Sequence, residues 1–398
     1  MASLTSLCTC RVQAQPLPPI RELGPIINRS TPSVASIAAA RELTHGTVLV
    51  NDIVSRRLYL FDSALAGLTI LLDSTVGAAN SYGDAPGGVI PYRGDSTLFV
   101  DPSSISILLL DPVGKVARVM AGPRLADIPF LVGGPYGTPG FDPNGRLIYR
   151  GSARRTTTRP GGNISSSPLL DFAPIVRMDL RTRNTDTVAL FRIARFTVTT
   201  SRTREGGFRR TVLKNPLPVV DDWAILPDGS VAIVRGQDFH VDLVKPDGAR
   251  NSLKKIPFAW RKLGDDEKAA FVDSVRNATN IVIAKLRASI AARYQGTGVG
   301  APEPVVFEYV SPNELPDYFP PFEPNAARAD PSGALWIRTT QINDGRPVYY
   351  VLGRSGVLTD RVQLPSGRVI AGFGSKGTIY LAYVDLSGGV KLERARVH

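Results

Sequence analysis

Four residues that stand close to predicted turns have the chemistry of a ligand site: Tyr136, Asp221, Trp223 and Asn325. Asp221 and Asn325 each precede a turn glycine by eight residues, so equivalent strands would place them at one height. Tyr136 lies at nearly that height in a third strand. Trp223 follows Asp221 by two residues, so both side chains share one side of the strand and the indole offers an apolar wall. We expect the four side chains to line one mouth of a channel.

Asp221 and Asn325 are also the candidate metal ligands. Oxygen side chains in register on neighbouring strands could hold a hard cation such as Ca2+. The first repeat has Ala38 at the matching height, and an alanine side chain cannot bind a cation. No other cofactor is expected. The chain has three histidines and two cysteines, which are too few side chains to build a zinc, iron or thiol site. The alternative is that carboxylates at strand ends, such as that of Asp221, only accept hydrogen bonds from backbone N–H groups, and we favour it.

The net charge of +12 is concentrated in one segment. Residues 150–214 contain 14 basic side chains and 4 acidic ones. A basic face on the third repeat would attract an anionic partner, and Arg154, Arg155 and Arg159 are the residues predicted to bind it. The alternative is an arginine-rich solvated surface, which we favour because no nucleic-acid motif accompanies the charge.

The elements that must position these residues are short β-rich units that recur along the chain. Each unit joins strands through a Gly-containing turn, as in LPDGSVAIVRG (226–236) and DPSGALWIRTT (330–340). Five units have four strands and the last has three. Residues 18–27 are predicted to supply the missing outer strand of the last unit. Without that strand, the exposed edge of the sheet could pair with other chains. We therefore predict an all-β fold: a six-bladed β-propeller over residues 35–398, with four strands per blade and the last blade completed by the N-terminal strand.

These units resemble those of six-bladed β-propellers of the NHL, TolB and gluconolactonase-like group, over about residues 35–397. The resemblance implies the fold. It implies no single activity, because the group includes lactonases, phosphotriesterase-like hydrolases, lyases and binding modules. Gluconolactonase-like members hold a metal on the propeller axis with Glu, Asn and Asp, and Asp221 and Asn325 would be the corresponding residues here.

Two segments interrupt the repeats. An insertion at about 263–296, between the fourth and fifth blades, has apolar residues three or four apart, which predicts a helix. The stripe comprises Phe271, Val275, Ala278, Val282, Leu286, Ile290 and Tyr294. It would pack on the propeller surface or, alternatively, form a lid over the channel. Residues 152–170 are rich in Arg, Thr, Gly and Ser, which predicts a loop.

The N-terminus bears on localisation. Residues 1–14 resemble a truncated signal peptide, followed by an N-terminal segment over residues 15–34 that includes the closing strand. This pattern favours a periplasmic or extracellular protein over a cytosolic one with an unstructured tail. No apolar run reaches the length of a transmembrane helix. We expect a monomer.

Two functions fit the sequence. The first is an exported, non-catalytic binding module that holds a protein, peptide or glycan on one face of the ring. The second is a metal-assisted lactonase or phosphotriesterase-like hydrolase with Asp221 and Asn325 as ligands. We favour the binding module, because the set of acidic ligands is incomplete.

Overall fold

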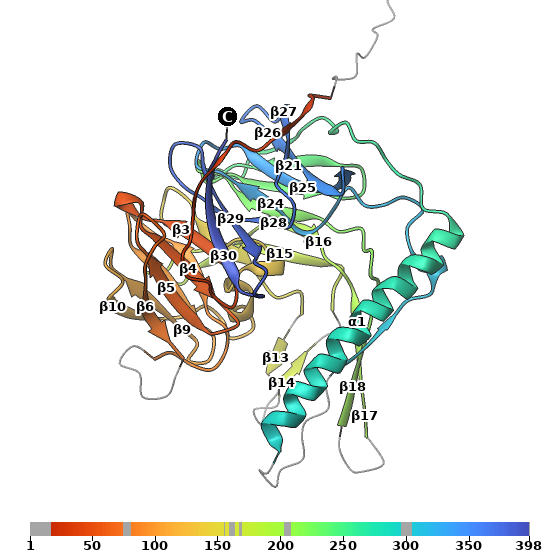
Figure 1. Ribbon diagram of the computed structural model, residues 1–398, viewed down its shortest axis with the longest axis horizontal. Coiled ribbons are helices and arrows are strands. Elements are labelled where there is room, and N and C mark those ends of the chain that lie inside the picture. Colours follow the sequence, from red (N-terminus) through yellow and green to blue (C-terminus); the bar gives the residue numbers. More distant parts are fainter. Residues whose placement is uncertain are drawn as a thin grey trace, which may run out of the picture.

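The computed structural model describes residues 17–74, 81–154, 156–158, 164–166, 169–202, 208–295 and 305–397. In these residues the fold is all-β, apart from one long helix and a few short 3-10 turns. Most strands belong to sheets of four or five strands, arranged side by side in Figure 1. No helix in the described residues is long and apolar enough to span a membrane.

Each of the first three sheets follows the chain from its first strand to its last. The first contains β3 (Ala39–Glu42), β4 (Val48–Asp52), β5 (Arg57–Phe61) and β6 (Leu68–Asp73). The second contains β7 (Gly88–Pro91), β8 (Thr97–Asp101), β9 (Ser106–Leu110) and β10 (Val116–Ala121). The third contains β11 (Gly140–Phe141), β12 (Leu147–Arg150), β15 (Phe172–Met178) and β16 (Thr185–Arg192).

Three further sheets complete the series. The fourth contains β19 (Asp222–Ile225), β20 (Val231–Arg235), β21 (His240–Val244) and β22 (Arg250–Ser252). The fifth contains β24 (Phe322–Ala329), β25 (Leu335–Asn343), β26 (Arg346–Leu352) and β27 (Leu358–Gln363). The sixth contains β28 (Arg368–Phe373), β29 (Thr378–Val384) and β30 (Val390–Arg396). Gly229 and Gly333 have φ of 82° and 87°, so each turn between the first two strands of the fourth and fifth sheets uses the left-handed region that favours glycine.

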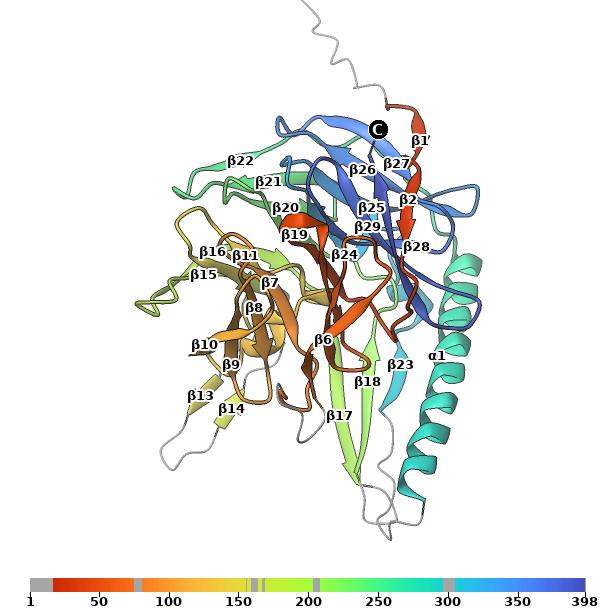
Figure 2. The same ribbon diagram turned by 60° about the vertical axis from the view of Figure 1, so that its left-hand side comes forward.

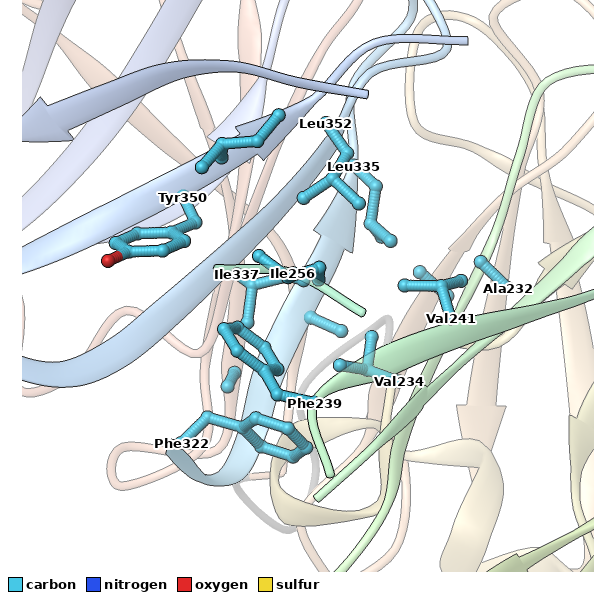
Figure 3. Close-up of a cluster of buried hydrophobic side chains, with 14 of the residues drawn as sticks. Ala232, Val234, Phe239, Val241, Ile256, Phe322, Leu335, Ile337, Tyr350 and Leu352 are labelled. Atoms are coloured by element: carbon cyan, nitrogen blue, oxygen red, sulfur yellow. The ribbon is translucent and has the colours of Figure 1, made fainter. Parts of the chain in front are cut away.

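Hydrophobic clusters join each sheet to its neighbours. β4 and β8 are buried at every position, because sheets cover both of their faces. Figure 3 shows the cluster between the fourth and fifth sheets, where Val234 and Phe239 pack near Ile337 and Tyr350. Equivalent clusters join the other neighbouring pairs, and one of them packs Val48 and other residues of the first sheet against the sixth. This cyclic packing of four-stranded sheets is that of a β-propeller.

The N-terminal segment is divided between two sheets. β2 (Ile26–Arg29) pairs antiparallel with β30 and forms the outer strand of the sixth sheet. β1 (Ile20–Glu22), which we predicted for that same strand, pairs parallel with β27 of the fifth sheet instead (Figure 2). Pro25 separates the two strands because it lacks an N–H for the ladder.

A second structural unit projects from the sheets. It consists of β17 (Phe196–Arg202), β18 (Phe208–Lys214), β23 (Val306–Tyr309) and α1 (Asp265–Tyr294), and we call it the arm. β18 pairs antiparallel with β17 and parallel with β23. Figures 1 and 2 both show β17, β18 and α1 running side by side away from the sheets. In the chain, α1 lies between β22 of the fourth sheet and β24 of the fifth.

Two predictions about the basic segment need correction. Residues 152–170 are not only a loop, because β13 (Thr156–Thr158) pairs with β14 (Ile164–Ser166) as a hairpin. The basic residues 150–214 do not lie on one face of the third repeat either. The third sheet ends at Arg192, the last residue of β16. β17 and β18 belong to a separate sheet, so their arginines lie in the arm.

Candidate functional site

The structure does not bring the four predicted residues together around one cavity. Asp221 lines a hollow beside Arg235 and His240, whereas Asn325 lines a cavity of about 630 Å³ beside Phe271 and Phe319. Trp223 and Tyr136 are in contact, because the indole Nε1 donates to the Tyr136 backbone oxygen at 3.1 Å. A role of these residues in ligand binding stays a prediction.

The Asp221 carboxylate accepts hydrogen bonds from three protein donors. Its Oδ2 accepts hydrogen bonds from the Arg192 backbone N–H at 2.9 Å and from Arg235 Nη1 at 2.7 Å. Its Oδ1 accepts from the Gly236 backbone N–H at 3.2 Å. The carboxylate therefore links the end of the third sheet to the fourth sheet. The Arg235 guanidinium is a partner that the favoured interpretation, with backbone N–H donors alone, did not include.

Trp223 does not form the predicted apolar wall, because it is 0% exposed. Its neighbour Tyr136 lies in a short 3-10 turn rather than in a strand. The Arg150 guanidinium lies 4.6 Å from the Phe130 ring centroid and 4.9 Å from that of Tyr136. Burial lowers the pKa of Arg150 to about 10. These rings and this cation pack together beside the third sheet, to which Arg150 belongs.

Asp222 is the carboxylate whose importance the sequence did not reveal. It is 4% exposed, and its Oδ2 accepts hydrogen bonds from the backbone N–H groups of Ala326 at 2.6 Å and Ala327 at 2.9 Å. It therefore joins β19 to β24 across two sheets. Burial raises the pKa of Asp222 to about 6, although these hydrogen bonds oppose the shift. The only signal in the sequence is the Asp-Asp doublet at a strand start.

The metal prediction rests on residues that lie apart. Asn325 Oδ1 accepts a long hydrogen bond of 3.5 Å from Arg328, and Asp221 belongs to another hollow. In the part of the chain that the structure describes, no three His, Cys, Asp or Glu residues are grouped to hold a metal ion. Calcium binding by Asp221 and Asn325 stays a prediction.

Several predicted residues lie outside the described residues. They are the signal-peptide segment 1–14 and the arginines Arg155 and Arg159. Arg154 is described and half-buried, and its backbone N–H donates to Ser152 Oγ at 3.2 Å. Binding of an anionic partner by Arg154, Arg155 and Arg159 stays a prediction.

The helix in the arm packs along a stripe that differs from the predicted one. Val272 is buried with Leu217, Leu263 and Leu315, and Thr279 Oγ1 lies 2.5 Å from the Tyr309 hydroxyl. Beyond Val275 the contact stripe continues through Thr279 rather than Ala278. Val282 is 65% exposed and Leu286 is exposed as well.

The far part of the arm combines exposed apolar and basic side chains. Phe208 is 63% exposed, and the Arg202 guanidinium lies 5.8 Å from its ring centroid. Strand alternation and the pairing of Arg202 with Phe208 place Arg210 on this same face. α1 adds the exposed side chains of Val282, Leu286 and Arg287. This surface is therefore basic and partly apolar.

The arm also presents an outer strand of regular geometry. β17 has β18 as its only strand partner in the described residues, and their register is continuous over seven residue pairs. By contrast, the ladders of the outer strands β6, β10 and β16 each contain a register shift, and β22 has three residues. Bulges and shortness hinder the addition of another strand to an edge. β17 is thus the outer strand best suited to pair with another chain.

Comparisons with known proteins found distant similarity to solved structures. No family model matches it, and the curated proteins contain no match. A gluconolactonase from Xanthomonas campestris is 11% identical, with 97% of this chain and 99% of that one covered and a TM-score of 0.43. A virginiamycin B lyase from Staphylococcus aureus is 12% identical, with 92% and 98% covered and a TM-score of 0.41. TolB from Acinetobacter baumannii is 10% identical, with 88% and 63% covered and a TM-score of 0.36.

These three proteins belong to the propeller group that the repeats resemble. At such low identity and TM-score, the similarity says nothing about what this chain binds or which reaction it performs. A functional argument has to come from the residues described above.

Proposed function

We propose that this chain is a six-bladed β-propeller that acts as a non-catalytic binding module and contacts an acidic protein through its arm. The cyclic series of clusters between neighbouring sheets supports six blades around one axis. Export and a monomeric state belong to the same proposal. An exported protein of this kind would meet its partner outside the cytoplasm.

The observation that carries the proposal is the regular outer strand β17 beside exposed arginines. A partner segment in extended conformation would add to β17 through backbone hydrogen bonds, which is a common mode of peptide recognition. Carboxylates on alternate residues of that segment would face Arg202 and Arg210, which lie on one face of the β17–β18 pair. A lipid surface offers no backbone groups for β17, so a protein partner fits this strand better.

The hydrolase alternative has less support. A metal-assisted reaction would need Asp221 and Asn325 to converge on one ion, but they line different cavities. Asp221 would also have to exchange three protein donors for the metal. Its carboxylate is better explained as a link between two sheets.

A peptide of alternating Glu and Val residues with a fluorescent label tests the proposed contact by anisotropy titration. We expect the double variant Arg202→Glu/Arg210→Glu to bind it at least ~10-fold more weakly, because two attractions become repulsions. Affinity of the unaltered protein should also fall as salt rises. Arg181→Glu is the matched control, because Arg181 is an exposed arginine in the turn between β15 and β16, outside the arm. This variant should bind like the unaltered protein.

Two results would contradict the proposed contact. One is equal affinity of the double variant and the unaltered protein. The other is preference for heparin or for vesicles containing phosphatidylserine over the peptide, which would indicate a polysaccharide or lipid partner. Circular dichroism of both variants checks that the β-structure is intact.

A further inference from the structure

An unexplained feature of the sheets is a cavity of about 560 Å³ on the propeller axis. Its lining includes residues from the innermost strands of all six sheets, β3, β7, β11, β19, β24 and β28. Much of the wall is small or apolar, for example Ala38, Ile225 and Phe373. None of the four residues predicted for the ligand site lines this cavity.

The charged residues that line this cavity differ in how strongly other protein groups bind them. Two aspartates line the cavity, and both are bonded within the protein. Asp142 forms an ion pair of 2.7 Å with Arg146, and Asp330 accepts hydrogen bonds from Trp336 Nε1 at 2.9 Å and from two backbone N–H groups. Their charge is therefore already compensated by protein donors.

Arg328 on the same wall has much weaker partners. Its Nη1 donates to Thr138 Oγ1 at 3.4 Å, and its Nη2 donates to Asn325 Oδ1 at 3.5 Å. Both distances lie beyond the usual range for an N–H···O hydrogen bond. Within the described residues, no carboxylate oxygen lies within 4.0 Å of this guanidinium. The nearby carboxylate of Asp222 already accepts three backbone hydrogen bonds.

A second arginine increases the positive potential of the cavity. Arg41 donates to the backbone oxygens of Ser96 at 2.5 Å and Gly94 at 2.8 Å, and these acceptors are neutral. Burial lowers the pKa of Arg41 to about 10 and also lowers that of Arg328. A partly buried guanidinium whose hydrogen bonds are long, as those of Arg328 are, gains strongly from an anion that reaches it.

We propose that the axial cavity binds a small organic anion, whose carboxylate or phosphate group is held by Arg328 and Thr138. The planar guanidinium would replace two long hydrogen bonds with a bidentate pair to the anion. The Thr138 hydroxyl would donate to a remaining oxygen. The apolar wall would contact the body of the ligand, as in most small-molecule sites. This site is separate from the arm and does not depend on the function proposed for it.

Calorimetric titration with three probes tests the proposal. Benzoate and phenyl phosphate carry the two anionic groups on the same ring, and benzamide is a neutral isostere of benzoate. We expect at least one anion to bind at least ~10-fold more tightly than benzamide. The better of the two anions tells whether the site prefers a carboxylate or a phosphate.

Variants locate the binding. Arg328→Met should weaken the better anion at least ~10-fold, and Thr138→Val should weaken it less, because it removes one neutral donor. Arg338→Met is the matched control, because Arg338 belongs to the same sheet but lines the other cavity. The control should bind like the unaltered protein. Thermal melting of each variant monitors folding, and Thr138→Val tests the site independently of Arg328.

Three outcomes would overturn this site. They are equal affinity for benzamide and benzoate, unchanged anion affinity in Arg328→Met, and no binding of either anion up to ~10 mM. A loss of binding in Arg338→Met would overturn it as well, because it would place the anion in the other cavity.

Discussion

Removal of residues 17–29 should lower the free energy of unfolding by more than about 4 kcal/mol or prevent folding. The deletion takes away β1 and β2, so it exposes the edges of β27 and β30. It also removes Leu23, which is buried between the fifth and sixth sheets. Finally, it takes Arg29 from Glu393, whose side chain is 0% exposed and pairs with Arg29 at 2.7 Å. A buried carboxylate that loses a partner is costly.

Urea titration followed by circular dichroism measures this effect. Glu22→Gln is the control within the same segment, because it only breaks the surface ion pair with Arg346. That change should cost under ~1 kcal/mol. An unchanged unfolding midpoint after the deletion would show that the two N-terminal strands do not stabilise the sheets.

Asp222 should make the protein less stable as pH rises from 4 to 7. Its pKa in the folded state is raised to about 6 by burial, so the folded protein holds this proton more tightly than the unfolded chain does. The resulting stabilisation is complete below about pH 4 and is lost as pH rises through about 6. The expected size is up to about 3 kcal/mol. Asp52, Asp238 and Asp242 have lowered pKa values, so their contributions change at lower pH.

Comparison with Asp222→Asn isolates this contribution. The amide does not titrate, so the unaltered protein should lose stability relative to this variant between pH 4.5 and pH 7. Asp228→Asn, an exposed position on the same sheet, should retain the pH dependence of the unaltered protein. Identical pH profiles for the Asp222 variant and the unaltered protein would contradict the assignment.

The sheets were more predictable than the site, and the reason is physical. Turns such as those at Gly229 and Gly333 need a left-handed residue, and they recur at fixed offsets from apolar strands. This pattern is local, so the sequence alone marks the strands. The division of the N-terminal segment by Pro25 depends on which sheet edges are nearby, and that is not a local property.

The residues around the axis depend on contacts that are distant in the chain. Asp221 and Asp222 are adjacent in sequence, but alternation sends one carboxylate to Arg235 and the other to the N–H groups of Ala326 and Ala327. Arg328 is one of 47 basic residues, and only its position opposite Thr138 distinguishes it. The exposure of Val282 and Leu286 was missed because it depends on which elements pack against α1, and that is not a local property of the sequence.

Amide hydrogen exchange measured with and without the Glu-Val peptide tests the central claim most directly. If the arm binds its partner by strand addition, exchange should slow in β17 and leave β10, an outer strand with a register shift, unchanged. Arg202→Glu/Arg210→Glu should abolish this protection. Protection of β10 or of another sheet edge, with β17 exchanging at its original rate, would contradict the claim that this propeller binds through its arm.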